Sequence, residues 1–483
     1  MSVFIDEVQD LSLENFSKVA HHGEACVLTT SAKSRIEGNR DKFLAFTEAH
    51  SSEHVYGVTT KHHTGAKAVL SRNDRTEYST RLPSTPATFG TPLPERLVRG
   101  IVFARLTDVL NGTACLRPTT VDRLLGLLDS GLAPVPRYGN GEPGDIIPLG
   151  TLLRSTFNGT LEIGEGMALI NGSPVGTAVL ADAAVNGRGM FGKAAAVFAL
   201  AAAAIGSPSA HYASDLGRLW NDPHQVAALD AMRDLLGPAV RADETPYQAP
   251  VSFRSAPRLL GWLHRTQKSV EECALISLQA SSNNPVFCPP SAEHPTGTML
   301  SNGGYHNPMV APSLDALSRA WADVCQLATS QVNRLCELGD GLIATEAEPQ
   351  VSLFYMTSAG WAEEARTAAT TSLISVAGGS QTDTGTPDLL AWNKSEHVRT
   401  ALDANLAVLA LVSAHTIARR NTPVPERLKS FQHDVLAAFP LGSDPEDFGD
   451  NLGMVAQVLD GLGSGAVEVA ASAYSSVGAQ ATA

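Results

Sequence analysis

The hydrophobic pattern of the chain changes at about residue 190. Before this point apolar residues come in short runs broken by glycine and proline, most densely in the segments 83–94 and 131–150, which predict shaped loops between short helices. After it, apolar residues recur every three or four positions over long stretches rich in alanine and leucine, a spacing that predicts amphipathic helices. The predicted helices cover residues 192–205, 313–338, 359–376, 397–420 and 451–474.

Strand signals are few, so the pattern predicts a mainly α protein built on a long antiparallel helical bundle. Alanine is the best helix former, and its small side chain lets helix axes approach closely. We therefore divide the chain into a loop and short-helix region, residues 1–190, and a helical bundle, residues 191–483.

Composition and charge exclude several classes of partner. The 483 residues carry 35 Lys and Arg against 49 Asp and Glu, a net charge of −14 without a basic stripe, which argues against nucleic acid. The most apolar segment, 194–205, is mostly alanine and shorter than the roughly 20 residues that cross a bilayer, so no membrane span is expected. Acids stand at the N-terminus where a signal peptide carries bases, which predicts a cytoplasmic protein.

The cysteines do not indicate a metal site. No two of them form a CxxC pair, and scattered thiols are more often buried apolar groups than ligands or disulfides. We expect neither a metal nor a disulfide at Cys26, Cys115, Cys273, Cys288, Cys325 or Cys336.

Eight motifs follow one another over most of the chain. They are VYGVTT (55–60), TPLPERLVRG (91–100), LRPTTVDRLLGLLDSGLAPVP (116–136), GDIIPL (144–149), EGMALINGSPV (165–175), VSFRSAPRLLG (251–261), SSNNP (281–285) and GGYH (303–306). In this order they resemble the aromatic amino acid ammonia-lyase family, which includes histidine and phenylalanine ammonia-lyases. The resemblance implies a helical homotetramer whose active sites are assembled from several subunits, with active-site loops in the N-terminal region and a small-molecule amino acid as substrate.

The chain departs from this family at the residues that make its prosthetic group. Family members use methylidene-imidazolone, an electrophile formed from an internal Ala-Ser-Gly, and the matching place here is Glu142-Pro143-Gly144. Ring formation needs a backbone N–H and a β-hydroxyl on the middle residue, and proline has neither. No Ala-Ser-Gly occurs elsewhere, so we expect no electrophile and no other cofactor.

The resemblance still assigns roles to several retained residues. Tyr56 matches the base that removes a substrate proton, although a free phenol with a pKa of about 10 must be activated. Arg254 matches the arginine that pairs with a substrate carboxylate, a bidentate contact that fixes orientation. Asn171 and Gln248 match amides at the substrate or electrophile, and Tyr305 lies in the matching GGYH motif. Each of these groups also has an ordinary structural interpretation, such as a buried tyrosine or a backbone-capping amide.

Other positions indicate a changed substrate. Val251 replaces a family tyrosine, Thr85 replaces a histidine, and Thr382 replaces an acid. The loop after the tyrosine carries Lys61, His62 and His63, which could bind an anion or move a proton near neutral pH, or could be a solvated polar loop.

Glu142 could hold a cationic leaving group or donate a proton, or it could be a solvated acid in an ordinary turn. Three functions remain open. The first is an elimination promoted by Tyr56 from an amino acid or betaine whose leaving group is already good, as in ergothionase, a similar enzyme that works on a trimethylammonium betaine. The second is an isomerase, conjugate-addition or cyclisation enzyme of specialised metabolism, and the third is a non-catalytic homologue.

Overall fold

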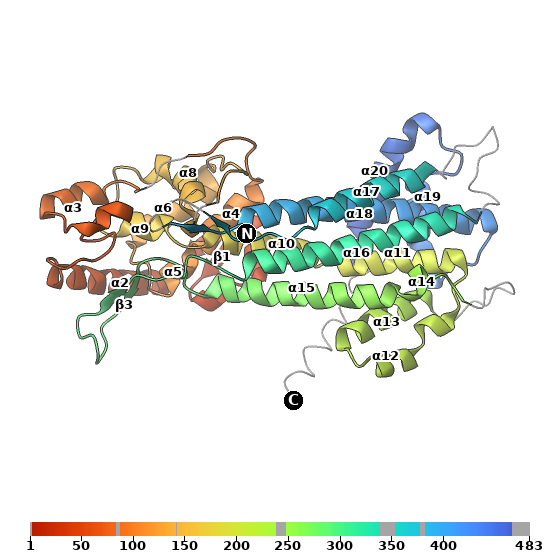
Figure 1. Ribbon diagram of the computed structural model, residues 1–483, viewed down its shortest axis with the longest axis horizontal. Helices are drawn as coiled ribbons and strands as arrows, with labels where there is room; N and C mark the ends of the chain where they lie inside the picture. Colours follow the sequence, from red (N-terminus) through yellow and green to blue (C-terminus); the bar gives the residue numbers. More distant parts are fainter. Residues whose placement is uncertain are drawn as a thin grey trace. The chain divides into compact units, whose positions relative to one another are not determined.

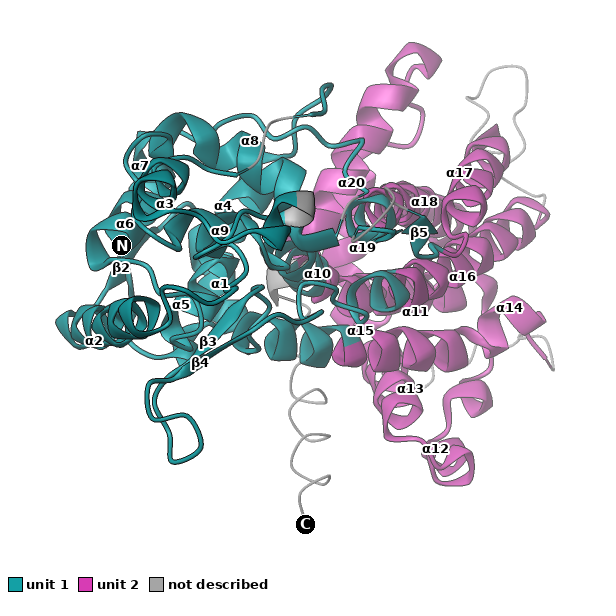
Figure 2. Cartoon of the chain, turned by 60° about the vertical axis from the view of Figure 1, so that its left-hand side comes forward, with its two compact units in different colours: residues 1–185, 270–314, 372–392 teal, residues 186–269, 315–371, 393–483 magenta. Residues whose placement is uncertain are grey.

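The chain forms two compact units. The computed structural model describes residues 2–83, 87–141, 143–237, 248–338, 353–376 and 382–465 (Figure 1). Unit 1 contains Met1–Val185, Val270–Leu314 and Ser372–Trp392, and unit 2 contains Asn186–Ser269, Asp315–Thr371 and Asn393–Ala483 (Figure 2). The first change of unit lies close to the boundary drawn from the sequence, but later segments of the chain return to unit 1, so each unit is discontinuous in sequence.

Unit 1 combines short helices, long loops and small sheets. Its elements are β1 (Ser2–Ile5), η1 (Val8–Asp10), α1 (Leu13–Ala20), β2 (Ala25–Leu28), α2 (Thr30–Ala49), η2 (His63–Lys67), α3 (Arg72–Ser79), α4 (Glu95–Ala104), α5 (Leu106–Leu110), α6 (Pro118–Leu125), α7 (Leu127–Ser130), η3 (Pro143–Asp145), α8 (Ile146–Phe157), α9 (Glu165–Ile170), most of α10 (Pro174–Gly187), β3 (Val286–Cys288), β4 (Thr298–Leu300), β5 (Ser375–Val376) and β6 (Thr384–Gly385).

Unit 2 is almost entirely helical. Its elements are α11 (Met190–Ile205), η4 (Ser209–Tyr212), α12 (Ser214–Trp220), α13 (Pro223–Leu236), α14 (Val251–Arg254), η6 (Glu426–Leu428), α17 (Phe354–Ala368), α19 (Lys429–Ala438), η7 (Pro445–Asp447), α20 (Phe448–Gly465), and the larger parts of α15 (Ala256–Gln279), α16 (Val310–Cys336) and α18 (Asp388–Arg420). These last three are the long helices of Figure 1, and each also contributes residues to unit 1. The mainly α class predicted from the sequence is confirmed.

Helix α11 shows how the alanine-rich pattern builds the core of unit 2. It packs against α13 and α20, and all of its residues except Ala203 and Ile205 are buried. A helix that is apolar on every side is stable in water only when it is surrounded by protein. It ends at Gly206, whose left-handed conformation (φ 71°) lets its N–H bond the carbonyl groups of the last turn.

The strands among the described residues form three two-stranded sheets. The β1–β2 pair is parallel, with Ser2 opposite Ala25, and the pairs β3–β4 and β5–β6 are antiparallel. These short sheets tie loops together and add little to the core, as the weak strand signals predict.

Four of the five predicted helices agree with the structure over their described residues, and one ends early. The helix predicted over 359–376 stops at Ala368, and Ser375–Val376 instead form β5. After the C-cap residue Ala369 come Thr370, Thr371 and Ser372. Their side chains either restrict rotamers or compete for backbone hydrogen bonds, which explains why the periodic apolar pattern did not continue as a helix.

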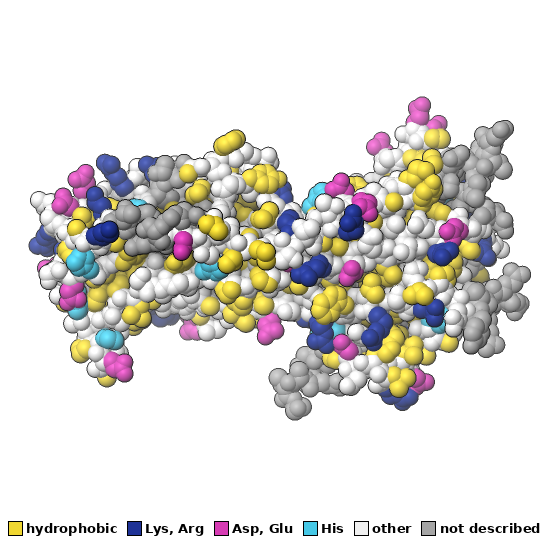
Figure 3. Space-filling view, viewed as in Figure 1, with side chains coloured by type: hydrophobic (Ala, Val, Ile, Leu, Met, Phe, Trp, Pro, Cys, Tyr) yellow, Lys and Arg dark blue, Asp and Glu magenta, His cyan; other side chains and the backbone are white. Residues whose placement is uncertain are grey.

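Two stretches of the described chain are long and apolar enough to cross a membrane, a criterion of length and composition that buried core helices also meet. They are Glu165–Ile205 and Asp388–Arg420, whose most apolar windows are 78% and 83% buried inside the structure. Such burial is typical of core helices, because a lipid-facing helix would expose its apolar side chains. On the face shown in Figure 3, acidic and basic side chains are interspersed, without a continuous basic stripe.

All six cysteines are free thiols in the structure, and the described residues contain no cluster of three or more metal-ligating side chains. Burial raises the pKa of the Cys26 and Cys115 thiols to about 12, so both stay protonated at neutral pH.

Candidate active site

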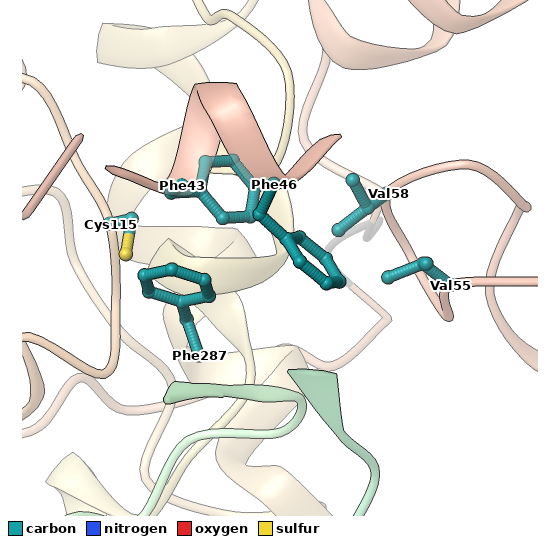
Figure 4. Close-up of a cluster of buried hydrophobic side chains, with 6 residues drawn as sticks. All are labelled: Phe43, Phe46, Val55, Val58, Cys115 and Phe287. Carbon is teal, nitrogen blue, oxygen red and sulfur yellow. The ribbon is translucent and has the colours of Figure 1, made fainter. Parts of the chain in front are cut away.

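Tyr56 lies in a tight turn fixed by the apolar core of unit 1. Its neighbours Val55 and Val58 belong to a buried cluster that also contains Phe43, Phe46, Cys115 and Phe287 (Figure 4). The Thr59 hydroxyl accepts a hydrogen bond from the Val55 N–H at 2.8 Å, and the Thr59 N–H donates to the Val55 carbonyl at 3.0 Å. The turn is therefore rigid while Tyr56 itself is half-buried.

A small cavity adjoins this cluster and is lined by Phe43, Val58, Cys115, Met167 and Asn283, among others. Its volume is about 20 Å³. That space holds about one water molecule and is too small for an amino acid. The protein beside the Tyr56 turn is therefore well packed, and this cavity is not a substrate pocket.

The loop after Tyr56 places one of its histidines against a residue that sequence reasoning missed. The Nδ1 atom of His62 lies 2.5 Å from the hydroxyl of Tyr78 in α3, and the two rings stack with centroids 6.0 Å apart. Lys61 is exposed, and His63 begins η2. The side chain of His63 lies outside the described residues.

The segment that the resemblance matches to the cyclising tripeptide continues into η3. Gly144 adopts a left-handed conformation (φ 81°), and the next residue, Asp145, does so too (φ 53°). A Cβ atom built on Gly144 would lie 2.9 Å from Asn171 Oδ1 and 3.7 Å from Tyr305 Cβ. The structure therefore brings Gly144, Asn171 and Tyr305 together, whereas Glu142 lies outside the described residues.

Asn171 is anchored through its backbone carbonyl, and its side-chain amide oxygen is left to bind a ligand. It is only 5% exposed, and its Oδ1 has no hydrogen-bond partner among the described residues. Its carbonyl accepts from Arg105 at 3.4 Å, and Arg105 forms a buried ion pair with Asp108. An amide oxygen that is buried, unpaired and next to a special turn is a candidate ligand-binding group.

The same ion pair connects two sequence motifs. Asp108 Oδ1 accepts from the backbone N–H groups of Ser282 (2.6 Å) and Asn283 (3.1 Å), and Ser282 Oγ accepts from the Ser173 N–H (2.9 Å). The buried ion pair of Arg105 and Asp108 therefore fixes the SSNNP and INGS segments against each other. Burying such a pair costs less free energy when each carboxylate oxygen accepts hydrogen bonds.

A buried carboxyl pair lies at the start of α10. Asp145 Oδ2 accepts from the N–H groups of Val175 (2.7 Å) and Gly176 (3.4 Å), and so caps the helix. A Cβ on Gly176 would overlap Asp388 Oδ2, which has no hydrogen-bond partner among the described residues. Burial and the nearby charge of Asp145 raise the pKa of Asp388 well above its ordinary value. Asp388 is therefore a carboxylic acid that keeps its proton to unusually high pH.

Arg254 and Gln248 belong to unit 2 and lie near His211. Arg254 is the last residue of α14, and its Nε atom is buried without a hydrogen-bond partner among the described residues. His211 Nε2 accepts from the N–H of Ala249, next to the exposed Gln248. Burial, followed by the positive charge of Arg254, lowers the pKa of His211, so this histidine is neutral at pH 7.

Thr85, the remaining predicted site residue, lies outside the described residues. Tyr78, His211 and Asp388 were missed because only the fold brings them to their neighbours. Nothing in the spacing of Tyr78 from His62, sixteen residues apart, indicates a contact.

Comparisons with known proteins agree with this architecture. The model of the aromatic amino acid lyase family matches residues 11–155 and 155–439. Histidine ammonia-lyase of Streptococcus gordonii is 27% identical over 357 residues, which cover 68% of each protein.

Two solved structures show the same fold. The ergothioneine-degrading enzyme ergothionase from Treponema denticola superposes with a TM-score of 0.84 and 17% identity, over 95% of this chain and 99% of that one. Phenylalanine aminomutase of Pantoea agglomerans has a TM-score of 0.83 and 18% identity, over 94% and 98%. Because the family model spans most of its length, the chain belongs to the aromatic amino acid lyase family.

Proposed function

We propose that this chain is a carbon–nitrogen lyase that works without methylidene-imidazolone. Its substrate is an amino acid or a betaine whose nitrogen is already a good leaving group, such as a quaternary ammonium. The phenolate of Tyr56 takes a proton from the carbon next to the C–N bond. The electron pair of that C–H bond forms the new double bond, and the amine leaves with the electrons of the C–N bond.

The observation that carries this proposal is the turn at Pro143. The residue that would supply an amide N–H and a β-hydroxyl for ring formation is a buried proline, and the sequence contains no Ala-Ser-Gly. The residues present therefore do not fit the prosthetic group. Without the electrophile an ordinary ammonium is a poor leaving group, which favours a substrate that carries a better one.

The other site residues take supporting roles in this proposal. Arg254 binds the substrate carboxylate, a task that suits a guanidinium whose Nε is still unpaired. Asn171 and Tyr305, which meet at Gly144, contact the substrate, as does the exposed Gln248. Recognition of the substrate is adjusted by Thr85, Lys61, His62 and His63. Glu142 holds the cationic leaving group. A relative in fold degrades ergothioneine, which makes betaines the first substrates to try.

Amine release from a panel of amino acid betaines and activated amino acids tests the proposal. We expect at least one betaine to release its amine, the matched primary amino acid to react far more slowly, and Tyr56→Phe to abolish the reaction. The purified protein should show no additional near-ultraviolet chromophore. Absence of amine release from every betaine, or a chromophore that survives denaturation, would contradict the proposal.

An isomerase, conjugate-addition or cyclisation reaction is the second candidate. The similarity of the fold to that of an aminomutase favours it, since an aminomutase yields an isomer. Recovery of a product with the same mass as its substrate, without free amine, would favour this reaction over elimination.

We also propose that the chain is a cytoplasmic homotetramer with active sites shared between subunits. Light scattering coupled to size-exclusion chromatography tests the assembly. Mixing inactive Tyr56→Phe and Arg254→Ala chains tests the shared sites, because partial recovery of activity requires residues from different copies.

A further inference from the structure

Helix α14 carries Arg254 but is too short to be stable by itself. It has four residues, Val251–Arg254, and one turn of helix fixes several backbone angles for few hydrogen bonds. The N–H groups of Phe253 and Arg254 close this turn by donating to the Pro250 carbonyl at 3.0 and 3.3 Å. The side chain of Arg254 keeps a buried Nε without a hydrogen-bond partner among the described residues. The position of the guanidinium therefore depends on what holds the backbone of α14.

Two neighbouring residues of η4 bind the segment before and within α14. His211 Nε2 accepts a hydrogen bond from the Ala249 N–H at 3.1 Å, and the Tyr212 hydroxyl donates to the Phe253 carbonyl at 3.3 Å. Tyr212 is 2% exposed, and burial raises the pKa of its hydroxyl to about 12, so it keeps the proton that it donates. Its oxygen also lies 3.2 Å from Ser207 Oγ, and η4 packs against α13. The two contacts therefore come from an element that is itself anchored in unit 2.

A third contact comes from the long helix α16. Gln331 is fully buried, and its Nε2 donates to the Ser252 carbonyl at 2.9 Å. The carbonyl groups of Ser252 and Phe253 lie in the last turn of α14, where a helix has acceptors that its own N–H groups do not satisfy. Leaving such a carbonyl buried without a donor costs about 1–3 kcal/mol, so the side-chain donors favour this one backbone arrangement.

We propose that His211, Tyr212 and Gln331 are positioning residues that hold the backbone of α14 so that Arg254 can bind the substrate carboxylate. We call these three side chains the α14 clamp. The inference rests on the proposed function for the role of Arg254 and adds the means by which its guanidinium is oriented. A guanidinium forms two parallel hydrogen bonds with a carboxylate only in a narrow range of orientations. A small movement of α14 therefore weakens the pairing, although the clamp acts only through the arginine.

The contact of His211 suggests a pair of variants that separates its hydrogen bond from its bulk. Because Nε2 accepts a backbone N–H, the ring proton lies on Nδ1. Glutamine can place an amide oxygen near the position of Nε2, whereas leucine has no acceptor. His211→Gln should therefore keep the contact with Ala249, and His211→Leu should remove it.

Steady-state kinetics with a reactive betaine and its carboxamide analogue tests the role of the clamp in recognition. Tyr212→Phe, His211→Leu and Gln331→Leu should each raise KM for the betaine about 10-fold and change kcat by less than about 3-fold. For the carboxamide, which carries no negative charge for the guanidinium, each KM should change by at most about 2-fold. His211→Gln should behave like the wild type. Equal losses for both substrates, which a general loss of packing would produce, would overturn the positioning role.

Hydrogen exchange measured by mass spectrometry needs no substrate. In peptides that cover residues 248–256, the three variants that break the clamp should speed amide exchange by about 10-fold, while His211→Gln should not. The matched control for Gln331→Leu is Gln326→Leu, which breaks a bond from the same helix to the Ala362 carbonyl (2.7 Å) and should leave these peptides unchanged. The control for Tyr212→Phe is Tyr355→Phe, at an exposed tyrosine of α17.

The two measurements distinguish failure of the clamp from failure of the proposed function. If exchange over residues 248–256 is the same in the wild type and in all three variants, the clamp is wrong, whatever reaction the enzyme catalyses. If exchange responds as expected but the wild type releases no amine from any betaine, the proposed function fails and the hold on α14 is supported.

Discussion

Two short turns of unit 1 are held by different kinds of contact. The turn at 55–60 retains a tyrosine and is anchored by apolar side chains, with Val55 and Val58 buried in the cluster of Figure 4. The turn at 143–145 is anchored by polar contacts, since the Gly144 carbonyl accepts from Gly172 at 3.3 Å and Asp145 caps α10. Gly144 and Asp145 have left-handed conformations there, and Pro143 stands at the position that the family resemblance assigns to the reactive residue. Apolar packing therefore holds one turn, and backbone hydrogen bonds hold the other.

The largest expected difference between the two turns is catalytic. Tyr56→Phe should lower the rate of the proposed elimination by about 10²- to 10⁴-fold, because a positioned base contributes that much. Pro143→Ala should change the rate by only a few-fold, since this residue has no reacting group. Steady-state kinetics on both variants measures the contrast. An equal loss in Pro143→Ala would mean that the second turn still takes part in the reaction.

The second-largest expected effect is the loss of stability when the buried ion pair of Arg105 and Asp108, next to Asn171, is broken. Asp108→Ala should destabilise the protein by about 3–5 kcal/mol, because Arg105 would remain as an uncompensated buried charge. The control is Asp122→Ala, which breaks the exposed pair with Lys33 and should cost about 1 kcal/mol or less. Urea unfolding followed by circular dichroism compares the two. Equal effects would show that the pair is not needed to hold the Asn171 carbonyl and the 281–285 segment.

A smaller loss is expected when Gly144 receives a side chain. Gly144→Ala should cost about 1–3 kcal/mol, because alanine is strained at φ 81° and its Cβ would press on Asn171 Oδ1. Gly38→Ala in α2, where a Cβ meets nothing within 4 Å, should instead stabilise the helix by roughly 0.5–1 kcal/mol. Thermal unfolding of both variants shows whether each substitution lowers or raises the stability of the protein. If Gly144→Ala left the stability unchanged, the turn would not be held in this conformation.

The smallest effect is a change in how stability depends on pH. The folded state raises the pKa of Asp388, so it retains a proton that the unfolded chain releases above about pH 4. This contribution is complete below that pH and is lost as the pH rises toward the pKa of the folded state. Asp388→Asn should flatten the dependence and raise Tm at pH 7 by roughly 2–4 °C. Asp41→Asn, at an exposed position of α2, is the control; a lower Tm for Asp388→Asn at pH 7 would mean that an ionised Asp388 has a stabilising partner.

The long helices were predictable because their periodic pattern reflects burial that is repeated over many turns. Residues 192–205 and 397–420 lie within α11 and α18, whereas the pattern alone missed the end of α17 at Ala368. A local run of Thr and Ser outweighed the apolar spacing there. Prediction was harder at the candidate site, because the residues that meet there come from distant segments of the chain.

The sequence by itself determined the helical class, the family resemblance and the absence of an Ala-Ser-Gly tripeptide, because each depends on residue types in a linear order. Only the tertiary structure joined Gly144 to Asn171 and Tyr305, placed Tyr78 against His62, and buried Asp388 beside Asp145. The physical reason is that hydrogen bonds and pKa values depend on distance and burial in space. Neither quantity is encoded in spacing along the chain.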